Sequence, residues 1–306
     1  MKSKIVMIGI FIVLVVITSI LAINVNEQKE SKFNIVTSFY PMYVATLNIT
    51  DGIDDVYVNN LTSSVGGCIH DYVLSTTELV TLAKADVLVI NGAGMESFMD
   101  KVFSNFDNLQ IIDTSTGIDI IHANCEELHH DHEGHNHETN AHIFVSVKNY
   151  IKQVQNICDK LVKIDSANAE KYIQNTKKYI AKLEELETQI QIVMNKINNK
   201  NIVTFHNTFD YFAADYGLNI IGTIENEHGK TPSASEIAQL IEDMKEHNVQ
   251  AIFVEPEYNI KIVNAISKET GAKIYELNAI TYGKNNKDEY INIMKNNLTV
   301  LKEALR

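Results

Sequence analysis

The tetrapeptide Asn-Ile-Val-Thr occurs twice in this 306-residue sequence, at 34–37 and again at 201–204. Each copy opens a series of short β-branched runs that alternate with helical patterns. Such alternation is typical of parallel sheets covered by helices. The sequence therefore predicts an α/β fold of two similar lobes, each with a parallel four-stranded sheet flanked by helices.

Four strands are expected in each lobe. They fall at 34–37, 56–58, 86–90 and 110–112 in the first lobe, and at 201–204, 218–221, 251–254 and 272–275 in the second.

Between the lobes, apolar residues recur every three or four positions from 166 to 198, and the opposite face carries Lys, Glu and Gln. This pattern predicts one helix of roughly 50 Å that joins the lobes. Asp165 or Ser166 can cap its start. The pattern is too short for a sustained coiled coil, so we expect a rigid connector.

The N-terminus has a short basic start followed by an uncharged, mostly apolar run at 5–23. This is typical of an export signal, and the run is also long enough to span a bilayer. A cleaved signal and an uncleaved anchor both remain open, and either puts the rest outside the cytoplasmic membrane. We expect a signal peptide or membrane anchor at 1–25 and a tether at 26–32. The first lobe is expected at 33–165, with a histidine-rich loop at 122–141, followed by the connecting helix at 166–198 and the second lobe at 199–306.

The formal net charge of −13 argues against nucleic acid as a partner and is compatible with cations. The three cysteines are odd in number, so they form no complete disulfide framework.

Seven of the eleven histidines fall between 122 and 142, with acidic residues among them. Imidazole and carboxylate groups both bind zinc and related ions. We expect the loop to be an auxiliary, weak metal-binding segment formed by His122, His129, His130, His132, His135 and His137.

Three further histidines are candidates for a tighter site. His70 follows the second predicted strand and a Gly-Gly pair, and His206 ends the first strand of the second lobe. His142 lies between the histidine-rich loop and a helix that Ser146 could cap. In open parallel sheets, ligands bind outside the carboxyl ends of the strands, so these side chains can meet between the lobes.

Several motifs, in order, resemble one known family. They are Thr-Ser-Phe-Tyr-Pro at 37–41, His-Asp-Tyr at 70–72, Ala-Asp-Val at 85–87, Asn-Gly-Ala-Gly-Met-Glu at 91–96, Ala-His-Ile at 141–143, Phe-His-Asn at 205–207, Phe-Ala at 212–213, Tyr-Gly-Leu at 216–218, Thr-Pro-Ser at 231–233 and Phe-Val-Glu-Pro at 253–256. The chain from residue 33 onward resembles the metal-binding proteins of cluster A-I ABC transporters, in their zinc-uptake branch. That resemblance implies two α/β lobes joined by a long helix, with the ion between them.

The resemblance implies that His70, His142 and His206 are the metal ligands. The manganese branch carries a carboxylate at the position of His206, and three nitrogens suit zinc better than manganese, so we expect Zn(II). The family usually has Leu-Asp-Pro after the last strand, whereas this chain has Leu-Asn-Ala with Asn278 in the middle. A water, Asn278 or Cys68 remains open as the fourth ligand.

The expected function is an extracytoplasmic, high-affinity protein that captures Zn(II) between its lobes and delivers it to an ABC permease. We expect a monomer. Glu255 is expected either to accept a hydrogen bond from a ligand histidine or to lie at a helix start.

Three alternatives remain: a manganese- or iron-binding member of the same family, a metal-dependent surface adhesin, and an exported zinc hydrolase with Glu255 or Glu225 as general base. The sequence has no His-Glu-x-x-His motif and no nucleophile elbow, which argues against an enzyme.

Overall fold

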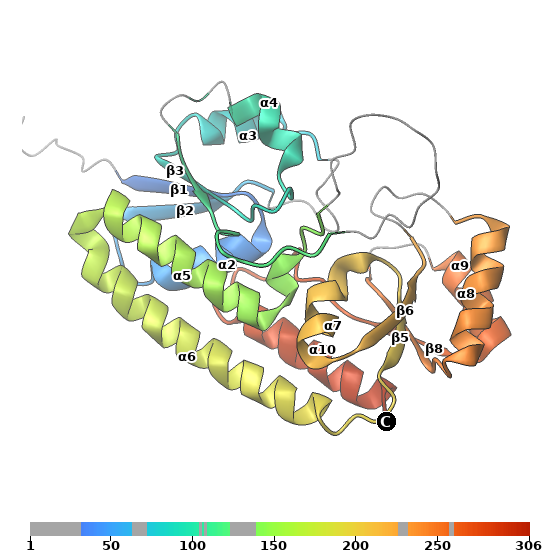
Figure 1. Ribbon diagram of the computed structural model, residues 1–306. Coiled ribbons are helices and arrows are strands. Elements are labelled where there is room, and N and C mark those ends of the chain that lie inside the picture. Colours follow the sequence, from blue (N-terminus) through green and yellow to red (C-terminus); the bar gives the residue numbers. More distant parts are fainter. Residues whose placement is uncertain are drawn as a thin grey trace, which may run out of the picture.

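The computed structural model describes residues 32–62, 72–103, 106, 109–122, 139–225, 232–256 and 260–306, and contains two parallel sheets (Figure 1). The first has the order β2-β1-β3-β4 and the second β6-β5-β7-β8. The strands are β1 (Phe33–Thr37), β2 (Val56–Asn60), β3 (Val87–Ile90), β4 (Gln110–Asp113), β5 (Asn201–Thr204), β6 (Asn219–Thr223), β7 (Ala251–Val254) and β8 (Lys273–Glu276). The prediction of two similar lobes with parallel four-stranded sheets is confirmed.

The strand order places a switch point in each sheet, because the first strand has neighbours on both sides. In the first lobe Thr37 of β1 pairs with Val89 of β3, and in the second Thr204 of β5 pairs with Phe253 of β7. Segments that leave the carboxyl ends of these central strands lie where open α/β sheets bind ligands.

Helices cover both sheets, and two of these helices begin with a capping box. Ser75 and Glu78 form a capping box on α3, and Ser233 and Glu236 form another on α8. The covering helices are α2 (Tyr40–Ile49), α3 (Thr76–Leu82), α4 (Asp100–Phe103) with the 3-10 turn η1 (Ser97–Met99), α7 (Asp210–Tyr216), α8 (Ala234–Glu246) and α9 (Lys261–Thr270).

The predicted connector is α6 (Ala169–Met194), which packs along α5 (Val147–Ile164) and runs from the first lobe to the lower end of the second (Figure 1). It is shorter than expected, with Asn195 at its C-cap. The predicted cap was wrong, because a 3-10 turn, η3 (Ser166–Asn168), precedes the helix and makes Asn168 its N-cap. The Asp165 carboxylate instead accepts from the Tyr172 hydroxyl at 2.7 Å.

The lobes are also joined by α10 (Glu289–Ala304), which comes from the second lobe and contacts α2 and α6. Its Tyr290 ring stacks on Tyr150 of α5, and both side chains are fully buried. The Tyr290 hydroxyl donates to the Phe144 carbonyl at 2.9 Å. One hydrophobic core thus extends through both lobes.

In the described part of the chain, no helix is both long and apolar enough to span a membrane. The predicted signal or anchor at 1–25 lies outside the described residues.

Candidate metal centre

His142 lies just before a short 3-10 turn, η2 (Ile143–Val145), and its side chain is buried. The side-chain amide of Asn91, beyond the end of β3, donates to the Ala141 carbonyl at 2.9 Å. On the other side, the Ser146 hydroxyl accepts from the Asn149 amide at 3.1 Å, which is the expected cap of α5. The backbone on both sides of His142 is therefore fixed.

The loop that carries Asn91 is unusually constrained. Gly92, Ala93 and Gly94 all have positive φ angles of 78°, 54° and 88°. At Gly92 an added Cβ would lie 2.0 Å from an Asp113 carboxylate oxygen, so a larger residue does not fit.

Glu96 braces this same loop from inside. Its carboxylate accepts from the Ser38 hydroxyl at 2.6 Å and from the Asn91 and Gly92 amides at 2.7 and 3.0 Å. Burial raises the pKa of the Glu96 carboxyl to about 7, although these three hydrogen bonds lower it.

His206 lies two residues after the end of β5, in extended backbone that leads into η4 (Asn207–Phe209). The Phe205 amide donates to the Phe253 carbonyl at 2.8 Å, which keeps the chain beside β7 past the end of the strand. The His206 side chain is buried, and its ring lies 5.2 Å from that of His142, measured between centroids, at an angle of 89°. Two predicted ligands from different lobes therefore meet.

Glu255 follows the last residue of β7 and is buried. Since Thr204 is paired with Phe253, the parallel register brings Glu255 to the same sheet edge as His206. Glu255 thus lies at the carboxyl edge of the sheet, where open α/β sheets bind ligands.

Asn278, after β8, is held in a turn rather than projecting freely. Its side-chain oxygen accepts from the Ile280 amide at 2.7 Å, and Ile280 has a φ of 64°. Asn297 also binds it, donating to its carbonyl at 2.8 Å and accepting from its amide at 2.9 Å.

The two ends of the histidine-rich loop meet. His122, which is exposed, and Thr139 form an isolated antiparallel bridge. The Thr139 hydroxyl donates to the Ala93 carbonyl at 2.8 Å, in the constrained loop described above. The histidine-rich loop therefore begins and ends beside the segment that carries His142.

The remaining candidates lie outside the described residues: His70, Cys68, His129, His130, His132, His135 and His137. Within the described ranges no group of three or more His, Cys, Asp or Glu side chains is close enough to hold a metal. The structure thus brings together His142 and His206 from the predicted set.

The sequence reasoning missed the residues that hold the two lobes together at this point. Asn140 donates from its side-chain amide to the Asn207 carbonyl at 2.8 Å and to an Asp210 carboxylate oxygen at 3.0 Å. The Tyr211 hydroxyl donates to the Asn140 carbonyl at 2.7 Å. The sequence offered one indication of this role for Asn140, namely that it lies two residues before His142.

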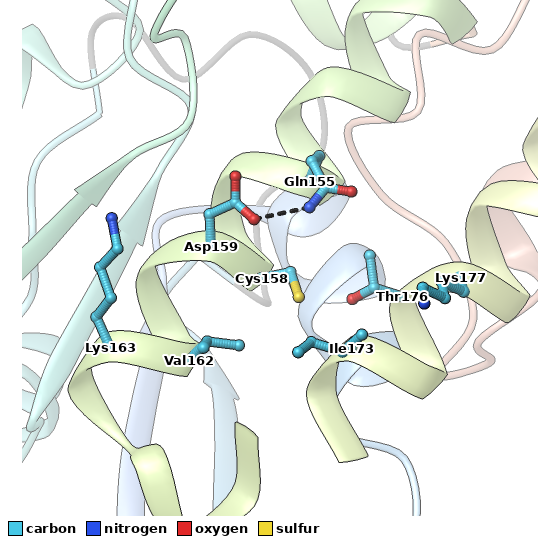
Figure 2. A pocket seen from close by; sticks show the side chains of 8 residues that line it. All are labelled: Gln155, Cys158, Asp159, Val162, Lys163, Ile173, Thr176 and Lys177. Carbon is cyan, nitrogen blue, oxygen red and sulfur yellow. Dashed lines mark hydrogen bonds between the residues drawn. The ribbon is translucent and has the colours of Figure 1, made fainter. Parts of the chain in front are cut away.

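A separate hollow of about 260 Å³ lies between α5 and α6 (Figure 2). Cys158 lines it, together with Gln155, which donates to Asp159 at 2.7 Å. Burial raises the pKa of the Cys158 thiol, so this cysteine is poorly suited to bind a metal as a thiolate. The hollow shares no residue with the histidine pair.

Comparison with known proteins gives a consistent result. Residues 35–304 match the family model described as zinc-uptake complex component A, periplasmic. The chain is 32% identical over 292 residues to the high-affinity zinc uptake system protein ZnuA of Bacillus subtilis, covering 91% of this chain and 89% of that protein. It is 30% identical over 294 residues to the zinc-binding lipoprotein AdcA of Streptococcus pneumoniae, covering 93% of this chain but only 58% of that protein.

Solved structures show the same similarity. A structure of FpvC from Pseudomonas aeruginosa in complex with Mn²⁺ has a TM-score of 0.79 at 27% identity, covering 90% of this chain and 98% of that one. A crystal structure of ZnuA has a TM-score of 0.77 at 26% identity, with coverages of 90% and 99%.

Proposed function

This chain belongs to the family of zinc-uptake complex component A, and we propose that it binds zinc between its lobes through His70, His142 and His206. It is a zinc-binding solute-binding protein of an ABC transporter. The observation that carries the site is the buried pair His142 and His206, whose ring centroids lie 5.2 Å apart.

The spacing of this pair suits a single ion. Imidazoles that share one tetrahedral zinc, with Zn–N bonds of about 2.0–2.1 Å, have ring centroids about 5 Å apart. Both residues are nitrogen donors, which zinc accepts more readily than manganese does. His70 would be the third donor.

For the fourth position we favour a water over Asn278. The Asn278 side-chain oxygen already accepts from the Ile280 amide, so binding a metal would compete with that turn. An amide oxygen is also a weaker zinc ligand than the usual Cys, His or carboxylate. Cys68 remains the other candidate.

Delivery would begin at the histidine-rich loop. His122, at its start, and Thr139, near its end, form a bridge. Thr139 lies three residues before His142, and its hydroxyl donates to the Ala93 carbonyl. Zinc collected weakly by the loop would therefore be released near the tight site. Loaded protein would then dock on the ABC permease of the uptake complex.

The family consists of metal-binding transport proteins whose place is outside the cytoplasm. We propose that this chain acts as a monomer without enzymatic activity, and that the apolar run at 5–23 exports or anchors it.

A competitive zinc titration of residues 33–306 tests the site. Native protein is expected to show one tight site and several weaker ones, and His206→Ala is expected to lose only the tight site. His247→Ala, an exposed histidine at the end of α8, is the matched control. Unchanged tight binding in His206→Ala would refute the proposed site, and tighter binding of Mn(II) than Zn(II) would favour the manganese branch.

A further inference from the structure

Asn140 is a buried polar residue that touches both lobes at the metal centre, with 1% of its surface exposed. Its side-chain oxygen accepts from the backbone amide of His142 at 2.9 Å and lies 2.9 Å from Nδ1 of the His142 ring. Its side-chain nitrogen donates to the Asn207 carbonyl and the Asp210 carboxylate. Every hydrogen-bonding position of this amide is therefore used.

The orientation of the amide follows from its partners. A carbonyl and a carboxylate can only accept, so the atom facing Asn207 and Asp210 is the nitrogen. The backbone amide of His142 can only donate, so the atom facing it is the oxygen. Exchange of the two atoms would set donor against donor and acceptor against acceptor.

This orientation has a consequence for the His142 ring. An amide oxygen can only accept, so Nδ1 of His142 must carry a proton to make the 2.9 Å contact. In a neutral imidazole the other nitrogen, Nε2, then holds the free lone pair. A metal ligand needs that lone pair.

We propose that Asn140 is a positioning residue that keeps the proton of His142 on Nδ1 and so presents Nε2 to the metal, an inference that rests on the function proposed above. Partners that orient a ligating histidine in this way fix its tautomer and its ring. Asn140 does not itself touch the ion.

Residues of the second lobe hold the Asn140 amide in this orientation. Asn207 and Asp210, which hold the Asn140 amide, follow His206 in the chain. The Tyr211 hydroxyl donates to the Asn140 carbonyl and accepts from the Ile121 amide at 2.9 Å. The tautomer of the His142 ring is thus set by the segment that carries His206.

Nitrogen-15 NMR of the histidine rings in metal-free protein is the direct test, since it reports which nitrogen is protonated. Native protein is expected to show His142 with its proton on Nδ1, and Asn140→Ala is expected to show a mixture of both tautomers. Zinc affinity of Asn140→Ala is expected to fall about 10–100-fold, the usual effect of losing such a partner.

Asn175→Ala is the matched control, because the Asn175 amide also donates to two backbone carbonyls, those of Ile49 and Asp51. It is expected to leave both the His142 tautomer and zinc affinity at native values. Equal losses of affinity in the two variants would reduce Asn140 to a structural role and overturn the proposal.

His142→Ala separates this inference from the proposed function. If His142→Ala keeps tight zinc binding, the site itself is wrong. If it loses tight binding while Asn140→Ala keeps both the native tautomer and the native affinity, only the role of Asn140 is wrong.

If Asn140→Ala does not fold, Asn140→Asp combined with Asp210→Asn is the second variant, because the second substitution replaces a like charge beside the new carboxylate with an amide donor. Its carboxylate still accepts from the ring, so His142 is expected to keep the proton on Nδ1. A His142 ring protonated on Nε2 alone in this variant would overturn the proposal.

Discussion

Tyr150 and Tyr290 stack face to face although they come from different lobes, with ring centroids 3.7 Å apart and planes 9° apart. Each ring is fully buried, and burial raises both hydroxyl pKa values well above 10. The contact between the lobes at this point is therefore as fully buried as a domain interior.

Tyr290→Ala is therefore expected to destabilise both lobes together. The loss is about 3–5 kcal/mol, as for other large buried aromatic residues. Tyr290→Phe, which loses only the hydrogen bond to the Phe144 carbonyl, is expected to cost about 1 kcal/mol. Urea unfolding followed by a probe in each lobe checks this. Two separate transitions in the native protein would contradict a shared core.

Glu96 is expected to make stability depend on pH. Its pKa rises from 4.5 to about 7 on folding, chiefly through burial. The folded protein therefore binds the proton more tightly than the unfolded chain. This difference adds to the free energy of unfolding. The added stability is complete below pH 4.5 and is lost as the pH rises to about 7. Its size is about 3 kcal/mol.

Urea unfolding of native protein and Glu96→Gln at several pH values isolates this effect. The stability of the native protein relative to the variant is expected to fall between pH 4.5 and 7. Glu246→Gln, at the exposed end of α8, serves as the control for loss of a carboxylate at the surface. A constant difference for Glu96→Gln would show that its carboxyl titrates normally.

Zinc affinity is expected to fall with decreasing pH because protons compete for the imidazole nitrogens. Between about pH 7.5 and 5.5, the range in which histidine titrates, the loss is expected to be about tenfold or more. Competitive titration with a chelator corrected for its own protonation measures it. Equal affinity at both ends of this range would count against three histidine ligands.

Deletion of residues 129–137 is expected to remove weak zinc sites and leave the tight one. The deleted segment contains five histidines but none of His70, His142 and His206. Isothermal titration of native and deleted protein measures both the number of sites and their affinities. A deleted protein without the tight site would place that site in the loop.

Local sequence patterns predicted the fold well. The β5 and β7 strands have the predicted bounds, because a strand pattern depends on residues close in the chain. The start of α6 was mispredicted because a 3-10 turn replaces the first helical turn there.

The tertiary partners of the site could not be predicted in this way. Asn140 meets Asn207 and Asp210 only after the lobes pack, and no local pattern marks such a pairing. The same is true of the Tyr150 and Tyr290 stack. The roles of His142 and His206 were predicted from a family resemblance, and the structure adds that their rings are neighbours.

The hydrophobic core shared by the two lobes limits how a permease can distinguish the zinc-bound protein from the zinc-free protein. Wide separation of the lobes would expose the faces of Tyr150 and Tyr290 to water, at a cost of several kcal/mol for two large aromatic side chains. We therefore expect empty and loaded forms to have nearly the same outline in solution scattering. The permease would then distinguish the zinc-bound form by a local change in the surface around His142 and His206.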